Sequence, residues 1–483
     1  NNGDGSFSDH TAHSGLTGIF GGLNVVTADY NNDGHMDVFV LRGGWMGAAG
    51  NHPNSLLKNN GNGTFEDVTY ASGLLSFHPT QTASWGDFNN DGWIDLFVGN
   101  EHGGADQNDN PSELYLNQKD GTFRNVASQL GLDVRVFAKG TAWGDINNDG
   151  LQDLYISNLL GKNLLFLNEG GTSINDWKFT DISKTSGVEN PLSSFPTWFW
   201  DFDNDGWLDI FVASYDMANL ITAQVVEANY WLGNKDFVKS RLYKNNGDNT
   251  FSDVTTEFGL DRPMFSMGAN FGDLDNDGFL DMYIGTGAPN LRSIIPNLAY
   301  RNNAGKSFED VSLTCAFGHL QKGHGVGFAD LDNDGDQDIY TVLGGAYEGD
   351  NYNNALFENP NETNAWITLE LEGINSNKKA IGSRIKITTT NHRDKKEIFY
   401  AVVSTGGSFG CSSVRQEMGL GQAKEIDEIE VTWSNGSQTV QKYLGAKLNK
   451  AFRIIEGQSA LQDLDYPMTK FKDAPMEGHK HHH

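Results

Sequence analysis

Aspartate, asparagine and glycine recur in a nine-residue pattern whose oxygen atoms could bind a metal ion. The clearest copy runs from Asp201 to Asp209, with carboxylates at positions one, three, five and nine and glycine at position six. Hard oxygen ligands at alternate positions around a sharp turn suit calcium, and glycine supplies the positive φ that such a turn needs. An EF-hand loop begins similarly but ends in glutamate at position twelve and opens a helix. Here the apolar run 210–212 follows position nine, so we predict a calcium-binding β-hairpin.

The pattern occurs six times, starting at Asp29, Asp87, Asp145, Asp201, Asp273 and Asp330. The starts are separated by 58, 58, 56, 72 and 57 residues, which is the signature of a repeat array. One such copy could be an Asp/Asn/Gly turn that binds no ion. Six copies with aspartates at fixed positions favour metal binding, because closely packed carboxylates repel one another without a cation.

We therefore predict about six calcium ions, each held by positions one, three, five, seven and nine of its loop. Position three is asparagine in the first three loops, which removes one charge from each, so we expect these loops to bind more weakly than the last three. The predicted ligands are Asp29, Asn31, Asp33, His35, Asp37, Asp87, Asn89, Asp91, Trp93, Asp95, Asp145, Asn147, Asp149, Leu151, Asp153, Asp201, Asp203, Asp205, Trp207, Asp209, Asp273, Asp275, Asp277, Phe279, Asp281, Asp330, Asp332, Asp334, Asp336 and Asp338.

Composition limits the partners of this chain. Its 483 residues carry a formal net charge of −29, and six calcium ions would leave it strongly acidic. This charge argues against DNA, RNA or an anionic membrane surface as a partner and leaves basic or cation-bridged partners open. No run of eighteen apolar residues is present, so we expect no membrane span. We interpret the chain as a mature or trimmed form of a secreted, extracellular or periplasmic protein, because weak calcium modules work where calcium is plentiful.

A second signature identifies the element that positions each loop. Asn-Gly, a few polar residues and Phe-x-Asp-Val recur between the Asp loops, for example at 60–68 and 246–254. Each repeat thus contains two hairpins and four short strands, which is the pattern of a β-propeller blade. We favour six blades, with residues 6–9 supplying the fourth strand of the sixth, and keep seven as the alternative if the long 201–273 interval or the following domain adds a blade.

The character of the chain changes near residue 360. Alternating apolar and polar residues predict strands at 366–373, 383–390, 397–403, 426–433 and 451–456, which suggests a small β-sandwich. We predict an all-β protein with a propeller over residues 1–360, a sandwich over 361–457 and a tail over 458–483 that ends in a remnant of a purification tag. The two cysteines, Cys315 and Cys411, are expected to be free and buried, although a disulfide is possible.

The repeats resemble the FG-GAP/VCBS repeats of integrin α-chains and of many secreted bacterial proteins. Several segments after residue 360 resemble the ASPIC/UnbV domain: Asn364-x-Trp366, residues 376–384, Ser404-Thr-Gly-Gly-Ser408, residues 419–421 and Val431-x-Trp433. The combination is similar to that of the cartilage acidic protein family. The resemblance implies a secreted calcium-binding protein with adhesive or ligand-binding roles, directed at a protein or carbohydrate.

The inner strands also carry one variable position, six residues before each loop, where a binding face could be built. Together with an aromatic residue nearby, these positions predict ligand contacts by Gln81, Lys139, Trp198, Met267 and His324. Trp198 could stack on a sugar while the polar residues donate hydrogen bonds. Alternatively, these residues are ordinary loop residues, or the imidazole and thioether groups of His78, Met264, Met267, His319 and His324 bind a transition metal such as copper.

Signatures of catalysis are weak. The sequence contains no Gly-x-Ser-x-Gly, no phosphate-binding loop and no His-Glu-x-x-His. An enzyme is accordingly only the alternative function. It would be of lyase, isomerase or cyclase type and would act on a natural product or glycan at the inter-blade face. In that case Lys139 and His324 are the best acid/base pair, since a propeller can host binding or catalysis.

Overall fold

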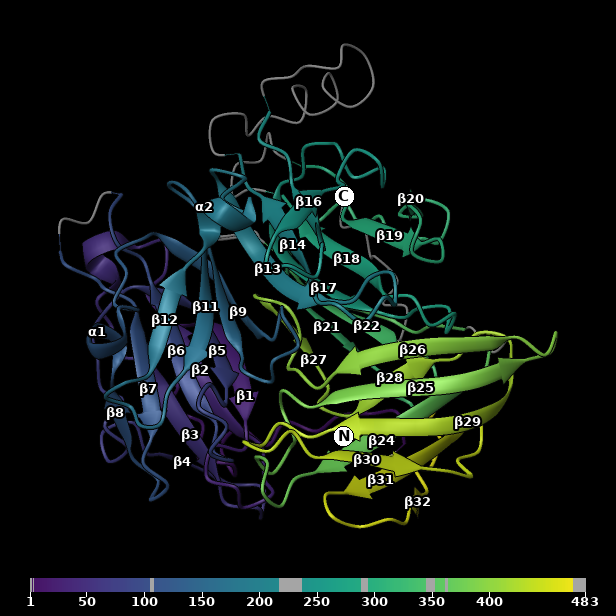
Figure 1. The fold of residues 1–483 in the computed structure, drawn as a ribbon. Helices are drawn as coiled ribbons and strands as arrows, with labels where there is room; N and C mark the ends of the chain where they lie inside the picture. The colour runs from purple at the N-terminus through teal and green to yellow at the C-terminus, as the bar shows by residue number, and fades with distance from the viewer. Residues whose placement is uncertain are drawn as a thin grey trace.

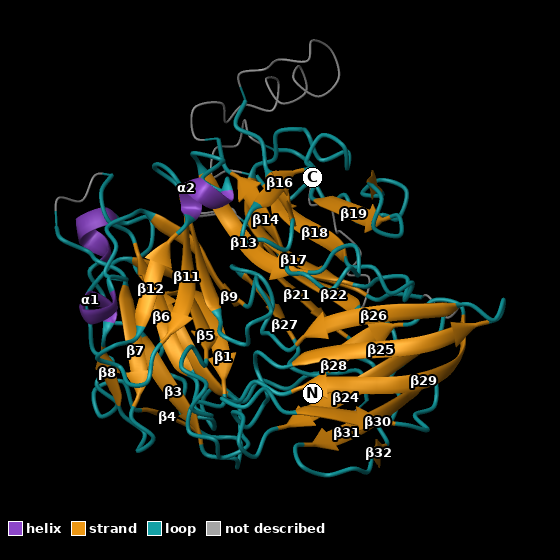
Figure 2. Ribbon diagram, in the orientation of Figure 1, coloured by secondary structure: helices purple, strands orange, loops and turns teal. Residues whose placement is uncertain are grey.

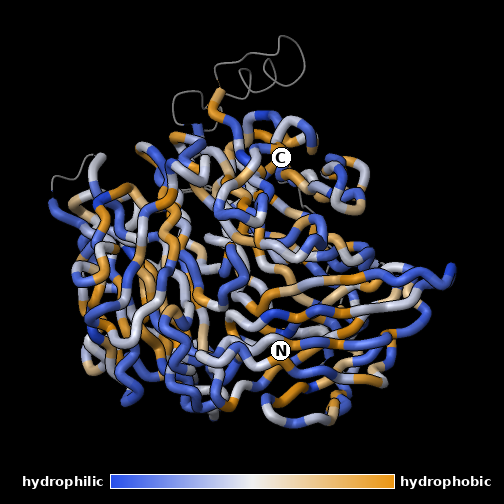
Figure 3. The backbone as a smooth tube through the Cα atoms, in the orientation of Figure 1, coloured by the Kyte–Doolittle hydropathy of each residue, from blue (hydrophilic) through white to orange (hydrophobic). Residues whose placement is uncertain are grey.

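Each Asp-loop repeat contributes a sheet to an all-β fold. The computed structural model describes residues 2, 4–104, 108–216, 237–287, 294–344, 352–360 and 364–471. Strands dominate these residues, and the short helices η1 (Gly47–Gly50), α1 (Ala127–Leu130) and α2 (Ser183–Ser186) lie in connections (Figure 2). Apolar residues gather along the strands, whereas many connecting loops are hydrophilic (Figure 3). No helix among the described residues is long and apolar enough to cross a membrane.

The first five repeats form separate antiparallel sheets of four strands. Within each sheet the strands lie side by side in chain order, as a meander, because every connection is a hairpin or a short loop. The sheets comprise β1 (Gly22–Ala28), β2 (Asp37–Arg42), β3 (Ser55–Asn59) and β4 (Phe65–Asp67); β5 (Thr80–Gly86), β6 (Asp95–Asn100), β7 (Glu113–Asn117) and β8 (Phe123–Asn125); β9 (Ala138–Gly144), β10 (Asp153–Asn158), β11 (Leu164–Gly170) and β12 (Lys178–Asp181); β13 (Ser194–Trp200), β14 (Asp209–Ser214), β15 (Arg241–Asn245) and β16 (Phe251–Asp253); and β17 (Ser266–Gly272), β18 (Asp281–Thr286), β19 (Leu298–Asn302) and β20 (Phe308–Asp310).

The Asp loop closes the first hairpin of every repeat. In the fourth sheet Trp200 pairs with Asp209, so positions one to eight of the loop form the turn between β13 and β14. The sequence prediction of a β-hairpin at this place is confirmed. The Asn-Gly signature lies between the third and fourth strands, as predicted, and Asn245 pairs with Phe251 across it.

Consecutive sheets of the repeats lie next to one another (Figure 1). Aromatic side chains pack between them. Trp85, two residues before its loop, meets Phe39 of the preceding sheet at a centroid distance of 6.2 Å, and Trp143 meets Phe97 at 6.3 Å. The first strands of neighbouring sheets are in contact from β1 through β21 (Gly323–Ala329). Face-to-face packing of successive sheets about the first strands is the arrangement of a propeller.

The sixth sheet differs from the others at its edges. It contains β21, β22 (Asp338–Leu343) and β23 (Ala355–Phe357), and its fourth strand is β27 (Gly410–Ser412), which pairs in parallel with β21. The prediction that residues 6–9 complete this sheet is wrong, because no strand is assigned to residues 4–21. The following domain supplies the strand instead, on the inner edge rather than the outer one.

The C-terminal region forms two facing four-stranded sheets, as the predicted sandwich requires. One contains β28 (Gln416–Gly419), β24 (Trp366–Glu372), β31 (Lys450–Ile455) and β32 (Gln462–Leu464). The other contains β26 (Lys396–Val402), β25 (Arg384–Asn391), β29 (Ala423–Thr432) and β30 (Val440–Tyr443). Their inner residues, among them Ile367, Ile385 and Trp433, belong to one buried core. Both cysteines are free, as expected, but Cys315 and Cys411 are exposed rather than buried.

Candidate metal centres and the domain interface

The backbone of every Asp loop is shaped by two residues with positive φ. Glycine at position six has φ between 82° and 100°, for example 88° at Gly206, which confirms the role predicted for it. Asparagine at position four also has positive φ in all six loops, for example 55° at Asn204. Asparagine tolerates this region better than other residues with a side chain. The two residues turn the chain sharply, so that the carboxylates at positions one to five converge.

The first aspartate organises the loop around its own carboxylate. Asp201 accepts the N–H of Asp205 at 3.1 Å through Oδ1 and the N–H of Gly206 at 2.8 Å through Oδ2. The other five loops repeat these two bonds, for example at Asp87 with Asp91 and Gly92. The loop therefore holds its shape through its own hydrogen bonds, and its ligand atoms are positioned in advance.

The last aspartate connects the loop to the next strands. Asp209 accepts the backbone N–H of Asn245 at 2.8 Å, and the Asn245 amide donates to the carbonyls of Leu208 and of Ile146 in the preceding loop. Equivalent asparagines end the third strand in the other sheets: Asn59, Asn117, Asn168, Asn302 and Asn359. The sequence patterns did not point to these asparagines, although an asparagine stands at the equivalent position of all six repeats.

Three loops bring acids close enough to share a cation. The carboxylates of Asp201, Asp203 and Asp209 offer oxygens within 4.8 Å of one another, as do those of Asp273, Asp275 and Asp281 and those of Asp330, Asp332 and Asp334. These are the loops with aspartate at position three. The first three loops place an asparagine oxygen there instead, which is also a hard ligand but carries no charge.

Buried oxygens without partners show that the loops fit a cation. Asp203 Oδ1, Asp275 Oδ1 and Asp95 Oδ2 are buried and accept no hydrogen bond, and the amide oxygen of Asn89 is in the same state. Leaving such groups unmatched is costly. All four atoms belong to predicted ligands, and a hard cation bound by oxygen would satisfy them. The donor set suits calcium better than a thiolate- or imidazole-binding metal.

The pKa values of the loop acids show the cost of leaving these acids without a cation. Burial raises the pKa of Asp201 and of Asp330 to about 7, and it raises that of Asp209 well above its usual range. In the sixth loop, burial and the neighbouring carboxylates raise the pKa of Asp336 to about 9. A bound divalent cation would reverse this balance, because it stabilises the charged form of each carboxylate.

A lysine contacts the carboxylates of the fourth loop, where its positive charge lowers the repulsion between them. Lys244 on β15 pairs with Asp203 and, at 2.8 Å, with Asp205. These interactions outweigh partial burial and raise its pKa above the usual range. The ammonium group therefore partly neutralises two predicted ligands of the fourth loop.

We expect Lys244→Gln to tighten calcium binding at the fourth loop. The wild-type ammonium must leave its carboxylates when calcium binds, and a partly exposed ion pair of this kind is worth up to about 1 kcal/mol, or about fivefold in affinity. Calcium titration by calorimetry would measure the change, with Lys442→Gln on the C-terminal domain as the matched control. Unchanged or weaker affinity in Lys244→Gln would contradict the competition.

The position-four asparagines link the loops into a chain. Asn204 donates to the carbonyl of Gly278 in the next loop at 2.7 Å, and Asn32, Asn90, Asn148 and Asn276 make the equivalent bond to the loop that follows each of them. Asn333 of the sixth loop donates instead to the carbonyl of Pro467 in the C-terminal tail. The six loops thus lie side by side on one face of the propeller, and the C-terminal region continues the series.

The C-terminal domain covers this face and contacts the loops directly. Arg384 donates to the carbonyl of Gly206 and to Asn148, Gln438 donates to the carbonyl of Asp149, and Lys379 donates to that of Gly34. A cavity of about 140 Å³ remains between the domains, with Trp200, Trp207 and Tyr400 among its walls. The predicted metal loops are therefore part of the domain interface.

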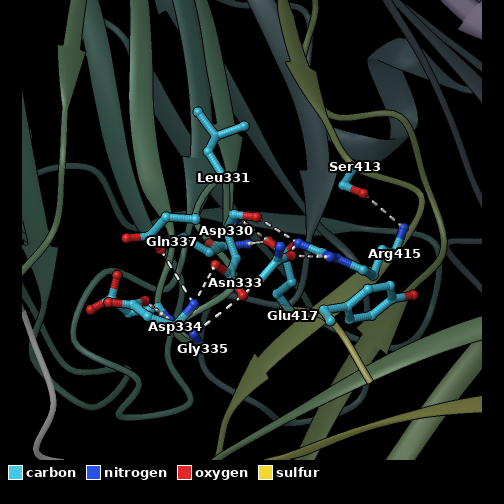
Figure 4. A network of polar contacts seen from close by, with 12 residues as sticks. Asp330, Leu331, Asn333, Asp334, Gly335, Gln337, Ser413, Arg415 and Glu417 are labelled. Carbon is cyan, nitrogen blue, oxygen red and sulfur yellow. Dashed lines mark hydrogen bonds and ion pairs between the residues drawn. The ribbon is translucent and has the colours of Figure 1, made fainter. Parts of the chain in front are cut away.

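The contact at the sixth loop is a network of charges (Figure 4). Arg415 donates to Glu417 at 2.8 Å, to Asn333 at 3.0 Å and to the carbonyl of Asp330 at 2.6 Å. Glu417 in turn accepts the backbone N–H of Asp330 at 2.9 Å and the amide of Gln337 at 3.1 Å. Both ends of this loop are therefore tied to β28 of the C-terminal domain.

A loop of the C-terminal domain enters the axis of the propeller. Ser408 accepts the N–H of Thr141 at 2.9 Å and donates to the Thr141 carbonyl, and Gly407 donates to Asn270 at 2.9 Å. Residues 405–411 also line a small cavity with residues of the first three sheets. The segment 404–412, which we call the axial loop, thus fills the space where the first strands meet.

We expect Gly410→Ala to destabilise the axial loop. A Cβ atom at this position would lie 2.5 Å from the backbone carbonyl of Ala269, so either the loop or β17 must move. Overpacking of this kind costs about 1–3 kcal/mol. Urea unfolding would measure the loss, with Gly18→Ala as the control, because a Cβ there meets no atom within 4 Å. Equal stability of the two variants would contradict tight packing on the axis.

The residues predicted to form a ligand face are mostly buried. Gln81 is 1% exposed, Lys139 0%, Trp198 1% and Met267 7%. Trp198 packs on Phe211 at a centroid distance of 4.7 Å, so its ring is part of the core. These four side chains therefore do not form an exposed face, because the first strands crowd together at the axis. Direct contact with a ligand stays a prediction.

Lys139 is held in a closed polar pair. Its ammonium contacts Glu101, donates to Gln81 at 2.5 Å and lies 3.4 Å from the ring centre of Trp45. The backbone N–H of Trp45 donates to the second oxygen of Glu101 at 2.8 Å. Burial lowers the pKa of Lys139 to about 8 and raises that of Glu101. The sequence patterns pointed to Lys139 but not to its contacts with Glu101 and Trp45, which are far from it in the chain.

The proposed acid/base and copper-binding sets are not assembled. His324 is bonded through Nε2 to the carbonyl of Gly344 at 2.9 Å, whereas Lys139 pairs with Glu101. His78 contacts Asn110, and His319 packs against Tyr352. Within the described part of the chain, the groups of acids, histidines and cysteines near enough to share a metal all lie in the Asp loops.

Two family models match the chain. The FG-GAP-like repeat model matches residues 1–40, 46–98, 87–156, 145–212 and 201–284, and the ASPIC and UnbV model matches residues 373–461. Both agree with the resemblance found in the sequence.

Curated relatives include cartilage acidic protein 1 of two mammals. The Mus musculus protein is 25% identical over 309 residues, which cover 61% of this chain and 42% of the relative. The Homo sapiens protein is 25% identical over 307 residues, which cover 60% and 41%. The chain thus spans less than half the length of these relatives.

Solved structures give weaker matches. The exotype rhamnogalacturonan lyase YesX covers 87% of this chain and 71% of its own, with 12% identity and a TM-score of 0.38. The V. cholerae biofilm matrix protein Bap1 covers 89% and 59%, with 12% identity and a TM-score of 0.34. Scores at this level carry no argument about function.

Proposed function

The chain belongs to the FG-GAP-like repeat family and carries an ASPIC and UnbV domain. From this premise we propose that it is an extracellular, calcium-binding propeller protein that acts in ligand binding or adhesion. The proposal keeps the predicted division into a propeller over residues 1–360, a sandwich over 361–457 and a tail over 458–483. Its partner would be an extracellular protein or carbohydrate.

The observation that carries the calcium proposal is the position of the loops. They present buried carboxylate oxygens without partners, and the same loops are held by the C-terminal domain. Calcium bound there would neutralise the acids and leave each loop in the shape that the domain contacts. Because the metal would bind the folded state only, it would stabilise that state by mass action. We therefore propose a structural role for calcium, which clamps the two domains.

The surfaces that the domain interface leaves uncovered are the candidate surfaces for a binding role. The C-terminal domain covers the loop face, and the axial loop fills the channel, so a partner would bind on the outer rims or on the opposite face. The strongly acidic surface suits a basic or cation-bridged partner. The enzyme alternative gains no support, because Lys139 and His324 are each engaged elsewhere.

The adhesive role can be tested on arrays of immobilised glycans and extracellular-matrix proteins. We expect the full chain to bind at least one class of probe in calcium and to lose that binding in EGTA. Binding that is equal in both conditions would contradict calcium-dependent adhesion. Absence of binding to every probe, together with turnover of any arrayed glycan, would favour the enzyme instead.

A further inference from the structure

The sixth sheet exposes a face that every other sheet buries. The third residue of the second strand points toward the following sheet, as the contacts of Phe39 with Trp85 and of Tyr155 with Phe199 show. This residue is 0% or 1% exposed in the first five sheets, at Phe39, Phe97, Tyr155, Phe211 and Tyr283. In the sixth sheet it is Tyr340, which is 42% exposed. Val342 and Leu356 on the same sheet are 39% and 36% exposed.

The first sheet exposes the opposite face. Its residue four places before the Asp loop, Val25, is 48% exposed, and Leu23 is 37% exposed. The equivalents of Val25 in the other sheets are at most 5% exposed: Ala83, Thr141, Thr197, Ala269 and Val326. Neighbouring sheets are in contact along the series, but within the described part of the chain no comparable contact joins β1 to β21 or β22. We call the space bordered by Leu23, Val25, Tyr340, Val342 and Leu356 the open slot.

The C-terminal domain leaves these side chains largely exposed, although residues 405–411 line a small cavity together with Val25. Its strand β27 pairs with the inner edge of β21, and the faces of the sixth sheet are left as they are. Five exposed apolar residues on the first and sixth sheets are unusual in a chain that buries nearly all of the equivalent positions in its other sheets.

Asn2, Ser6 and Ser8 make the hydrogen bonds of the second turn of a repeat. Asn2 N donates to the Ser6 carbonyl at 2.9 Å, its amide donates to Ser6 Oγ at 3.0 Å, and Ser8 Oγ donates to Asn2 Oδ1 at 3.0 Å. In the fourth repeat Asn246 makes the same three bonds with Thr250 and Ser252. This turn normally joins the third and fourth strands.

The residues that follow also take the place they have in a repeat. The Ser14 carbonyl accepts the N–H of Phe65 at 2.9 Å, just as the Ser72 carbonyl accepts that of Phe123 in the next repeat. Phe7, however, is 67% exposed, whereas its equivalents Phe123, Phe251 and Phe308 are 6–8% exposed and the other two, Phe65 and Phe179, are half-buried. Among the described residues, no strand pairs with residues 7–9. The second turn of a repeat and the segment that follows it are therefore in position, but no first, second or third strand lies beside them among the described residues.

We propose that the open slot binds three antiparallel strands of the same repeat type, whose third strand pairs with residues 7–9. Such strands would present to Tyr340 the aromatic residue that Trp85 presents to Phe39, and their second strand would cover Val25 and Leu23. The ring would then consist of seven sheets. The interface already used five times in this protein specifies this occupant, because the same positions and the same turn recur.

A tandem fusion tests this proposal. Residues 138–167, which include the first three strands of the third repeat, are placed directly before residue 1, so that Asn1 stands where Asn168 stands in that repeat. With Cys315 and Cys411 replaced by serine, Val342→Cys reports on the slot through its rate of reaction with a maleimide dye. Leu444→Cys, at a position 73% exposed on the C-terminal domain, is the matched control.

We expect the fusion to slow labelling of Val342→Cys about tenfold or more, because packed side chains react only after local opening. Labelling of Leu444→Cys stays unchanged, and the melting temperature rises. A fusion of the same residues in shuffled order gives neither effect. Equal labelling of Val342→Cys in the fused and parent chains overturns the proposal.

Two further measurements test whether Tyr340 contacts the added strands and whether a second copy of the chain occupies the open slot. Tyr340→Ser in the parent chain should leave the melting temperature nearly unchanged, since this ring is already exposed, but should abolish the gain in the fusion. A large loss in the parent would overturn the proposal. If analytical ultracentrifugation shows a dimer of the parent chain in which Val342→Cys is protected, a second copy occupies the slot and the proposal is likewise wrong.

Discussion

We expect removal of calcium with EGTA to lower the melting temperature of this protein by more than about 10 °C. A site held at about 100 times its Kd contributes about 2.7 kcal/mol, and each kcal/mol shifts the melting temperature of a sizeable domain by about 2 °C or more. The last three loops, with aspartate at position three, should contribute most of the loss. Differential scanning calorimetry in calcium and in EGTA measures the change.

A variant separates loss of metal from other effects of the chelator. Asp275→Ala removes a predicted ligand of the fifth loop, and Oδ1 of this aspartate has no protein partner. The variant should therefore lower the melting temperature in calcium and change it little in EGTA. Asp248→Ala, on an exposed turn, serves as the control. The same melt in calcium and in EGTA would refute a structural role for calcium.

Lys139→Met lowers the free energy of unfolding by about 3–5 kcal/mol, because it leaves the Glu101 carboxylate buried without its partner. The loss is of this size because Lys139 and Glu101 are 0% and 2% exposed. The double variant Lys139→Met/Glu101→Gln removes both charges and should recover most of the stability. Urea unfolding of the two variants measures the difference.

The deficit of Lys139→Met should also depend on pH. Burial raises the pKa of Glu101 in the folded state, and removing Lys139 takes away the interaction that lowers it. A carboxyl group with a raised folded pKa binds more protons folded than unfolded, so its stability contribution falls as pH rises through that pKa. The deficit should therefore be smaller at about pH 5 than at about pH 8. Equal deficits at both pH values, or no recovery in the double variant, would contradict the buried pair.

The local elements could be predicted because short-range patterns determine them. Glycine at position six and aspartates at alternate positions specify the turn, and the apolar run after Asp209 specifies the strand that follows. The closure of the propeller could not be predicted in the same way. Residues 6–9 have the pattern of a fourth strand, but a pattern does not show which third strand, if any, lies beside it.

The loops could be predicted as a metal-binding set, but their surroundings could not. Asn245 and its equivalents, like the position-four asparagines, donate hydrogen bonds to neighbouring repeats. Only the fold brings these side chains to the neighbouring loops. The same reason explains why the burial of Trp198, a predicted ligand contact, could not be foreseen. The axial loop and the adjacent strands close that space, and residues more than 200 positions later in the chain supply the cover.

The contact between the loops and the C-terminal domain gives calcium a second consequence. Arg384, Arg415 and Lys379 all bind groups of the loops rather than distant surfaces. A change in the shape of a loop would therefore be felt at the domain interface. In this account the metal stabilises the docking of the domain as well as each hairpin.

Native mass spectrometry of the tag-free chain, combined with metal analysis before and after chelation, tests the central claim most directly. The account predicts about six calcium ions per chain, with three released at lower EGTA concentration than the rest, because the first three loops carry one aspartate fewer. A chain that holds no calcium at millimolar free calcium, or that holds a transition metal in these loops instead, would contradict it.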